Sequence, residues 1–329
     1  MVAFPALSVR PSVRLSRRWP ADVETALAAR YEVQLNLADR PMDPAGFRDA
    51  MTRFDVVCPT VTDRLGEAEL SAPGRRVRLI ANYGAGVDHI DLDAARRLGV
   101  QVSNTPDVLT DATADLALLL ILMAARRAGE GERELRRGDW TGWRPTHLLG
   151  QGLAGKQLGL VGFGRIGQAT ARRARALGMR IAYYSRRRAA PVVETELAAI
   201  HHPTLESLVS SSDVVSLHCP GGAETRHLID AGALALMKST AILVNTSRGS
   251  VVNERDLASA LSAGVIAGAG LDVFEAEPGV EPALLAHENA VLLPHLGSAT
   301  LDARTAMGLR VVANIDGFFE SGEVIDRVA

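Results

Sequence analysis

The sequence is poor in cysteine and in long apolar runs, and each shortage excludes a class of protein. Only Cys58 and Cys219 occur among 329 residues. A disulfide framework, a CxxC pair and a zinc-ligand spacing are therefore excluded, and we expect no bound metal. So few cysteines are typical of a reducing compartment, which predicts a cytoplasmic location. The longest apolar run, Leu116 to Ala125, is far shorter than the ~20 residues of a membrane span and predicts a buried helix.

The sequence also has little net charge. It contains 36 Lys and Arg against 38 Asp and Glu, a formal net charge of -2. General nucleic-acid binders and membrane-surface binders are usually basic, so we expect neither kind of partner. The composition, 47% hydrophobic and 22% charged, is that of an ordinary globular protein, and at about 150 residues per domain the length predicts two domains.

The first 21 residues carry four arginines and no acidic residue, which gives them some likeness to a transit peptide. They lack the apolar core of a secretory signal. We expect a surface strand here, preceded by a short loose tail.

From Ser12 to Thr105, short apolar strands alternate with amphipathic helices, which predicts a parallel α/β layer. The expected elements are a helix at Ala21 to Arg30 and strands at Val13 to Leu15, Val33 to Leu37, Asp55 to Cys58, Val77 to Asn82 and Val100 to Ser103. Asp107 to Arg127 then predicts the longest helix of the chain, with Pro106 ahead of it as a hinge between two lobes.

The alternation resumes after Gln157 and predicts a six-stranded, doubly wound parallel sheet. Its expected elements are a helix at Arg165 to Leu177 and strands at Leu158 to Phe163, Met179 to Tyr184, Asp213 to Leu217, Ala241 to Asn245, Ile266 to Asp272 and Ala290 to Leu293. The last helix, Leu301 to Glu320, has no place in this sheet, so we expect it to return to the first lobe. The predicted fold class is α/β, with two Rossmann-like doubly wound parallel-sheet domains and a cleft between them. Residues 1–104 with 296–329 would bind substrate, and residues 105–295 would bind a dinucleotide.

A glycine-rich motif, GFGRIG at Gly162 to Gly167, follows a predicted strand and opens a predicted helix. In that context a GxGxxG motif indicates dinucleotide binding, because its glycines let backbone N–H groups approach a pyrophosphate at the positive end of the helix. The residues expected to bind the pyrophosphate are Gly162, Phe163, Gly164, Arg165, Ile166 and Gly167.

The residue after the second strand of this motif indicates which dinucleotide is bound. NAD enzymes usually carry an acidic residue here, which accepts hydrogen bonds from the ribose 2′-hydroxyl. This chain has Ser185, followed by Arg186, Arg187 and Arg188. Without the carboxylate a 2′-phosphate is not repelled, and a guanidinium can bind it, so we expect NADP to be preferred and NAD to remain possible. A solvated basic loop would explain the arginines but not the missing acid.

Three polar residues, Arg248, Glu277 and His295, come shortly after three consecutive strands predicted in the second half of the chain. Ligands of open α/β sheets bind at the carboxyl ends of the strands, so these side chains can converge on one edge. Each residue taken singly also fits a surface or capping role. Together they suit hydride transfer to a 2-oxo acid: His295 donates a proton to the carbonyl oxygen, Glu277 favours the imidazolium, and Arg248 holds the carboxylate and the carbonyl oxygen.

A second glycine-containing turn, NYGAGV at Asn82 to Val87, ends a strand of the first lobe. Its backbone N–H groups could form a nest for the substrate carboxylate. A plain strand-to-helix turn ahead of Asp88 explains the same pattern equally well.

With these residues the chain resembles the D-isomer-specific 2-hydroxyacid dehydrogenases, and within them the glyoxylate/hydroxypyruvate reductases. The resemblance runs from about Ser12 to the end of the sequence. It rests on NYGAGVDHI from Asn82, NTPDVLTDATADL from Asn104, the GFGRIGQA motif, NTSRGSVV from Asn245, LDVFEAEP from Leu271 and PHLGSAT from Pro294. One departure is Gly221-Gly222, where a Leu-Thr pair is more usual.

The resemblance implies a role for each matching residue. Arg248, Glu277 and His295 correspond to the catalytic triad, and Ala85 and Gly86 would present amides to the substrate carboxylate. Trp143, in a Trp-Thr-Gly-Trp segment from Trp140, would lie on a dimerisation arm and reach the partner's substrate pocket in a homodimer; a place in the hydrophobic core is the alternative. The remaining residues expected to contact the cofactor are Thr110, Ser185, Arg186, Arg187, His218, Cys219, Pro220, Thr225, Thr246, Ser247, Arg248, Asp272, His295 and Gly297.

The function we expect is NADPH-dependent reduction of small 2-oxo acids, glyoxylate and hydroxypyruvate first. A D-lactate or other aliphatic D-2-hydroxyacid dehydrogenase is the alternative among enzymes, because the sequence does not show which side chains line the pocket. A dinucleotide-sensing, corepressor-like binding protein is the alternative of another class, since the fold alone does not exclude it. The complete set of Arg248, Glu277 and His295 argues against that alternative.

Overall fold

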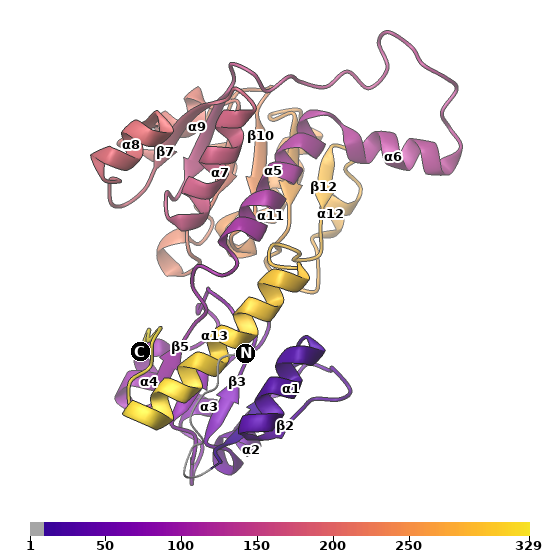
Figure 1. Cartoon of the computed structure of the whole chain (residues 1–329). Helices are drawn as coiled ribbons and strands as arrows, with labels where there is room; N and C mark the ends of the chain where they lie inside the picture. The colour runs from indigo at the N-terminus through magenta and orange to yellow at the C-terminus, as the bar shows by residue number, and fades with distance from the viewer. Residues whose placement is uncertain (1–9) are drawn as a thin grey trace. The chain divides into compact units, whose positions relative to one another are not determined.

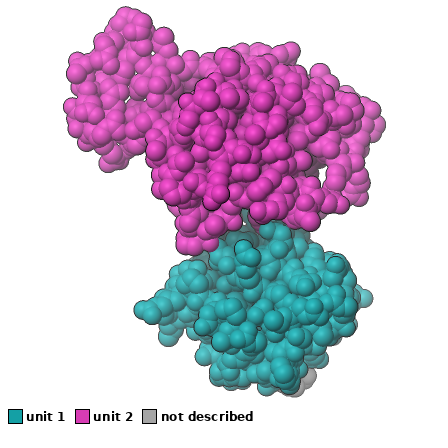
Figure 2. All heavy atoms as spheres, turned by 180° about the vertical axis from the view of Figure 1, so that it is seen from behind, with its two compact units in different colours: residues 1–109, 299–329 teal, residues 110–298 magenta. Residues whose placement is uncertain are grey.

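The computed structural model describes residues 10–329 and divides into two compact units (Figure 2). Unit 1 comprises the described part of Met1–Leu109 together with Ala299–Ala329, and unit 2 is Thr110–Ser298. Each unit is built on one all-parallel sheet, five-stranded in unit 1 and seven-stranded in unit 2. The predicted α/β class with two parallel-sheet domains is confirmed.

Unit 1 has the strand order β2-β1-β3-β4-β5. Its strands are short and mostly buried, as expected for parallel strands covered on both faces. They are β1 (Ser12–Leu15), β2 (Glu32–Gln34), β3 (Val56–Cys58), β4 (Leu79–Ala81) and β5 (Gln101–Ser103). The helices are α1 (Ala21–Arg30), α2 (Pro44–Arg53), α3 (Glu67–Leu70), α4 (Leu92–Arg97) and the C-terminal α13 (Leu301–Ser321).

Helix α13 returns to the sheet of the N-terminal half, as predicted, and packs on α1 and β4 (Figure 1). Thr300 caps its start by accepting a hydrogen bond from the Ala303 amide, and Gly322 ends it in the left-handed conformation. The buried hydroxyl of Tyr31, just after α1, donates to Asp316 of α13. The opposite face of the sheet is covered by α2, α3 and α4, whose apolar side chains form one cluster with those of the strands.

Unit 2 has the strand order β12-β11-β10-β9-β6-β7-β8. The chain turns from β8 back to β9 beside β6, so the sheet is doubly wound. The strands are β6 (Gln157–Val161), β7 (Arg180–Tyr184), β8 (Ala199–His201), β9 (Val214–Leu217), β10 (Ile242–Asn245), β11 (Gly268–Leu271) and β12 (Ala290–Leu292). The helices are α5 (Thr110–Ala125), α6 (Ala128–Arg137), α7 (Arg165–Ala176), α8 (Pro191–Leu197), α9 (Leu205–Ser211), α10 (Ala231–Leu236), α11 (Glu254–Ser262) and α12 (Pro282–Leu285).

Helices cover both faces of this sheet, as Figure 1 shows. One apolar cluster joins α5, α7 and α8 to the sheet, and another joins α9, α10, α11 and α12 to it. Because both faces are buried, the carboxyl ends of the strands and the loops after them are the accessible part of the sheet.

The structure corrects four expectations from the sequence. The sheet of unit 2 has seven strands rather than six, because the short edge strand β8 was not recognised. Helix α5, predicted to be the longest, has 16 residues, whereas α13 has 21. It is shorter than predicted because left-handed backbone at Asp107 (φ 70°) and Arg127 (φ 51°) interrupts the predicted helix near both ends. Strand β1 is buried between β2 and β3 rather than on the surface, and most of the tail expected before it lies outside the described residues.

The fourth correction concerns the run Leu116 to Ala125, which was expected to be buried. One face of α5 packs on the sheet, but Leu119 and Leu122 on the other face are exposed. No helix in the part of the chain that the structure describes is long and apolar enough to cross a membrane.

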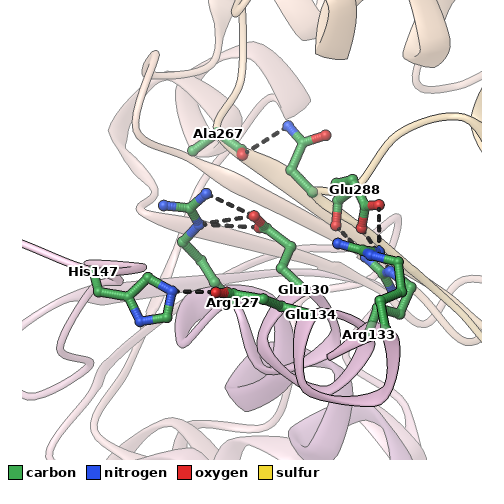
Figure 3. Close-up of polar contacts among 9 residues, drawn as sticks. Arg127, Glu130, Arg133, Glu134, His147, Ala267 and Glu288 are labelled. Carbon is green, nitrogen blue, oxygen red and sulfur yellow. Dashed lines mark hydrogen bonds and ion pairs between the residues drawn. The ribbon is translucent and has the colours of Figure 1, made fainter. Parts of the chain in front are cut away.

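Helix α6 and the chain after it form an arm, residues 126–150, that projects from unit 2 (Figure 1). The only buried residue of α6 is Gly129. The helix is held by ion pairs instead, as Figure 3 shows: Arg133 pairs with Glu288 at 2.6 Å, and Glu134 pairs with His147 at 2.7 Å. A cavity of about 470 Å³ remains at the base of the arm, beside Arg127 and Leu149.

Candidate active site

The carboxyl ends of three neighbouring strands of unit 2 carry the three predicted catalytic residues. Strand β11 lies between β10 and β12. Arg248 follows β10, Glu277 follows β11 and His295 follows β12. Since parallel strands end at the same edge of a sheet, the three loops share one edge.

Glu277 and His295 form a direct pair. Oε2 of Glu277 lies 2.8 Å from Nδ1 of His295, and Oε1 accepts a hydrogen bond of 3.0 Å from the amide of Phe274. Burial pushes the pKa of Glu277 upward, but the bond and charge of His295, the Phe274 amide and the charge of Arg248 outweigh it, so the pKa lies below its ordinary range. The carboxylate is therefore ionised at neutral pH and leaves Nε2 of His295 to face a ligand.

The loop of Arg248 is held by a buried amide and by close backbone packing. Oδ1 of Asn245 accepts from the amide of Ser247 at 3.0 Å and from its hydroxyl at 2.9 Å, and Nδ2 donates to the carbonyl of Arg248 at 2.9 Å. At Gly249, a Cβ atom would lie 1.8 Å from the carbonyl carbon of Phe274. Only glycine permits this approach, which holds the Arg248 loop against the loop that carries Glu277.

Asp272 fixes the segment that follows His295. Its carboxylate accepts hydrogen bonds from the amides of Leu296 (2.6 Å) and Gly297 (2.8 Å). Burial raises the pKa of Asp272, although these two amides and the charge of His295 act against the rise. Asp272 thus holds the backbone of the segment that carries His295 and Gly297.

The glycine-rich motif lies between β6 and α7, as predicted, and its geometry suits a pyrophosphate. Gly162 has φ 91°, and a Cβ there would lie 2.7 Å from the backbone of His218 and Cys219. A Cβ on Gly164 would meet no described protein atom within 4 Å, so the start of α7 is open to a ligand. Helix α7 has no acidic residue in its first turn and no side chain that caps it. The N–H groups of its first turn and its positive end therefore fit an anion, and the residues present fit a dinucleotide.

The residues after β7 include one ion pair that the sequence did not reveal. Arg186 pairs with Glu224, and both side chains are exposed. Ser185 donates from its hydroxyl to the carbonyl of Arg187 at 2.6 Å. Arg188 is held by Glu194 in a two-pronged contact of 2.9 and 3.0 Å, so both Arg186 and Arg188 pair with acidic residues of unit 2.

The loop after β9 abuts the glycine-rich motif, since Gly162 packs against His218 and Cys219. Burial lowers the pKa of His218 to about 4, so its imidazole is neutral at physiological pH. Thr225 closes the loop by donating to the carbonyl of Pro220 at 2.7 Å. The structure thus brings His218, Cys219, Pro220 and Thr225 to one side of the motif.

Two threonines predicted near the nicotinamide also lie in unit 2. Thr246 follows β10 directly, and its buried hydroxyl oxygen has no hydrogen-bond partner among the described residues. Such an oxygen favours a ligand group beside it, because an unpaired buried polar atom is costly. Thr110 begins α5.

The predicted substrate nest lies in unit 1, at the turn after β4. There the amides of Ala85 and Gly86 donate to no acceptor found within residues 10–329. Trp143, the remaining predicted substrate contact, is 82% exposed on the arm of unit 2. The alternative of a core position for Trp143 is therefore wrong for the single chain.

Sequence reasoning missed three groups of this site. Glu224, the partner of Arg186, lies 38 residues further along the chain, and no local pattern signals such a pairing. Asn245 carried a signal, because an amide at the end of a buried strand needs partners. The third group consists of Asn82 and Asn104, whose side chains donate to carbonyl groups of the Ala85–Gly86 turn. In the described part of the chain, no cluster of three or more His, Cys, Asp or Glu is placed to hold a metal.

Comparison with known proteins adds evidence of a different kind. A family model described as D-isomer specific 2-hydroxyacid dehydrogenase, NAD binding domain, matches residues 118–297. The chain is 44% identical to the glyoxylate reductase of Thermococcus litoralis over 321 residues, 96% of each chain. It is 43% identical to the glyoxylate reductase of Pyrococcus furiosus over 320 residues, 96% of this chain and 94% of the relative.

Solved structures give the same result over both units. A glyoxylate reductase from Paecilomyes thermophila superposes with a TM-score of 0.86 and 34% identity, covering 97% of this chain and 98% of that one. The NADPH-dependent glyoxylate/hydroxypyruvate reductase of Sinorhizobium meliloti, solved in complex with NADP and malonate, has a TM-score of 0.87 and 36% identity, covering 98% of this chain and 97% of that one.

Proposed function

Because the chain belongs to the D-isomer specific 2-hydroxyacid dehydrogenases, oxidoreductases with a nicotinamide dinucleotide-binding domain, we propose that it reduces small 2-oxo acids with NADPH. Glyoxylate and hydroxypyruvate are the first substrates to test, since the relatives named above carry those activities in their names. The family and the enzyme class predicted from the sequence are confirmed. The observation that carries the proposal is the 2.8 Å pair of Glu277 and His295 beside Arg248.

His295 is the proton donor in this proposal. When bound, NADPH supplies a hydride to the carbonyl carbon of the substrate. Negative charge then develops on the carbonyl oxygen, and an imidazolium within hydrogen-bond reach donates a proton to it. Glu277 bonds Nδ1, which keeps Nε2 as the donating atom.

Arg248 and the nest of unit 1 bind the substrate in this proposal. The guanidinium carries a permanent charge and can contact the carboxylate and the carbonyl oxygen together, which orients the carbonyl carbon. The amides of Ala85 and Gly86 bind the carboxylate. Unit 1 is thus the substrate-binding domain, and unit 2 the dinucleotide-binding domain.

The preference for NADPH rests on the residues after β7. The residue directly after β7 is Ser185 and not the acidic residue that would repel a 2′-phosphate, and Arg186 and Arg187 offer charge-assisted hydrogen bonds to it. The Sinorhizobium relative was solved with NADP. The adenine side would be bound by the loop from His218 to Thr225, and the nicotinamide side by the predicted residues Thr110, Thr246, Ser247, Asp272 and Gly297.

We also propose a cytoplasmic homodimer joined through the arm and the exposed face of α5 that precedes it. Exposed apolar side chains on the arm favour a second copy of the chain as its partner, and Trp143 would then reach the partner's substrate pocket. Both cysteines are free thiols, which suits a reducing compartment.

The test is the loss of nicotinamide absorbance with purified protein and glyoxylate, run in parallel with NADPH and NADH. We expect turnover that prefers NADPH. His295→Ala should abolish turnover while NADPH binding stays near normal, and His287→Ala, at a histidine outside the triad, is the control.

Other outcomes reject separate parts of the proposal. A preference for NADH would reject the cofactor assignment, and turnover by His295→Ala would reject the proton donor. Turnover only with longer 2-oxo acids would support the aliphatic D-2-hydroxyacid dehydrogenase alternative. No turnover with any 2-oxo acid would reject the function.

A further inference from the structure

The turn that carries Ala85 and Gly86 is held through its carbonyl groups by two asparagines. Nδ2 of Asn82 donates to the carbonyl of Gly84 at 3.0 Å and to that of Gly86 at 2.9 Å. Nδ2 of Asn104 donates to the carbonyl of Ala85 at 2.7 Å. The carbonyl groups of three consecutive residues, Gly84, Ala85 and Gly86, are therefore held by asparagine side chains of unit 1.

This arrangement fixes the direction of the amides as well. In a trans peptide the C=O of one residue and the N–H of the next point in opposite directions within one plane, and the only cis peptide among the described residues is Glu277-Pro278. Holding the Gly84 carbonyl thus aims the Ala85 N–H away from the protein, and holding the Ala85 carbonyl aims the Gly86 N–H. Asn82 aims the Ala85 amide together with the Thr105 amide, which donates to the same Gly84 carbonyl at 3.0 Å, and Asn104 aims the Gly86 amide.

The orientation of the Asn82 side chain is itself determined. Asn82 is fully buried, and both hydrogens of its amide are committed to carbonyls, so Oδ1 must be an acceptor. That oxygen lies 3.0 Å from Nε2 of His89. Nε2 of His89 therefore carries a hydrogen and donates it. His89 orients Asn82, and Asn82 orients the turn.

We propose that Asn82 and Asn104 are positioning residues for the 2-oxo acid, with His89 fixing the Asn82 amide. They aim the Ala85 and Gly86 amides at the substrate carboxylate and do not touch the substrate themselves. This inference rests on the proposed function, since it takes the nest to be a carboxylate site.

The inference predicts which kinetic constant changes. The charge of the carboxylate is the same in the ground state and in the transition state of carbonyl reduction, so a well-aimed nest binds both equally and acts on KM rather than on kcat. Losing aligned hydrogen bonds to a charged group typically weakens binding about tenfold or more. Oxalate, a carboxylate that is not reduced, should lose affinity by the same factor.

The variants are Asn82→Asp, Asn82→Ala and Asn104→Ala, and each is measured for glyoxylate KM and kcat, oxalate Ki and NADPH Kd. We expect KM and Ki to rise together by about tenfold, most for Asn82→Asp, which loses both donors and adds a negative charge. Values of kcat should stay within about threefold and NADPH Kd within about twofold. Asn36→Asp is the matched control, because Asn36 also donates to two carbonyls of unit 1, those of Ser16 and Arg40, and it should leave KM unchanged.

A rescue series at His89 separates positioning from mere packing. His89→Gln keeps an N–H donor for Oδ1 of Asn82 and should retain most of the affinity for oxalate, whereas His89→Ala should lose it in part. Equal behaviour of the two variants, or an unchanged oxalate Ki in Asn82→Asp, overturns the inference even if the wild type reduces glyoxylate. If the wild type reduces no 2-oxo acid, the proposed function fails instead, and oxalate binding by calorimetry to wild type and Asn82→Asp still decides the role of the asparagines.

Discussion

At the scale of single residues, the charge of Glu277 governs how His295 can act. Because the pKa of Glu277 is lowered, its carboxylate stays ionised at pH values where an ordinary glutamate would already be protonated. It is protonated only when the pH falls through the lowered pKa. Glu277 therefore keeps its negative charge beside Nδ1 of His295 at neutral pH.

Glu277→Gln should lower reductase activity. The amide keeps a polar group near Nδ1 of His295 but removes the negative charge beside the ring. We expect kcat/KM for reduction at pH 7.5 to fall by about 10- to 100-fold, measured with glyoxylate and NADPH. The matched control is Glu275→Gln, since Glu275 also pairs with a histidine, His227. An unchanged kcat/KM in Glu277→Gln would contradict the role of this carboxylate.

In the proposed function, Arg186 is the residue on which cofactor choice depends most directly. Arg186→Ala should weaken NADPH binding by about tenfold and leave NADH nearly unchanged, because only NADPH carries a 2′-phosphate. Glu224→Gln should do the opposite and tighten NADPH a few-fold, since Glu224 holds the same guanidinium. The effect is small because exposed ion pairs contribute little. Fluorescence titration with both cofactors measures these changes.

The control for this prediction is Arg188→Ala, because Arg188 is engaged by Glu194. It should change the affinity for neither cofactor by more than about twofold. Equal losses of NADPH and NADH affinity in Arg186→Ala would remove the 2′-phosphate argument, and a larger NADPH effect at Arg188 would assign the phosphate to another arginine.

At the scale of elements, sequence periodicity located the buried inner strands and missed short or exposed elements. The inner strands β6, β9 and β10 are continuous apolar runs, and they were placed to within a residue or two. Strand β8 was missed because it has three residues, lies at the edge of the sheet and exposes Ile200. Helix α6 was missed for the same reason: it buries almost nothing, so its sequence carries no apolar stripe that faces a core.

The candidate site likewise has residues that the sequence predicts and contacts that it does not. Arg248, Glu277 and His295 could be predicted together because the ends of neighbouring parallel strands meet at one edge, a property of the sheet and not of the residues. The contacts of Asn82 with Gly84, Gly86 and His89 could not be predicted. They depend on the rotamer of one buried amide, which no spacing in the sequence determines.

At the scale of the whole molecule, exposed apolar surface is concentrated in one stretch of chain. Between residues 119 and 149 the large exposed apolar side chains are Leu119, Leu122, Leu135, Trp140, Trp143 and Leu149. A helix held mainly by ion pairs and followed by exposed tryptophans buries too little surface to be stable by itself. A second copy of the chain would cover it, and closed two-fold dimers are the commonest assembly of soluble proteins.

The dimer is tested on α5, where Leu119 and Leu122 face outward. Leu119→Asp with Leu122→Asp places two charges on the expected interface, and burying unpaired charges there is costly. By light scattering we expect the wild type near twice the chain mass of 35.0 kDa and the double variant near the single mass. Leu236→Asp is the matched control, because Leu236 is 46% exposed and Leu119 is 45% exposed, yet Leu236 lies on α10, away from this stretch.

Trp143→Ala separates assembly from catalysis in the same protein. If Trp143 reaches the partner's substrate pocket, the variant should stay dimeric while KM for glyoxylate rises several-fold, since the other exposed apolar side chains of this stretch still join the two copies. The monomeric double variant should then lose affinity for glyoxylate to the same degree, because its pocket lacks the partner's side chain. A monomeric wild type, or a double variant that remains a dimer with unchanged KM, would show that this apolar stretch has another occupant.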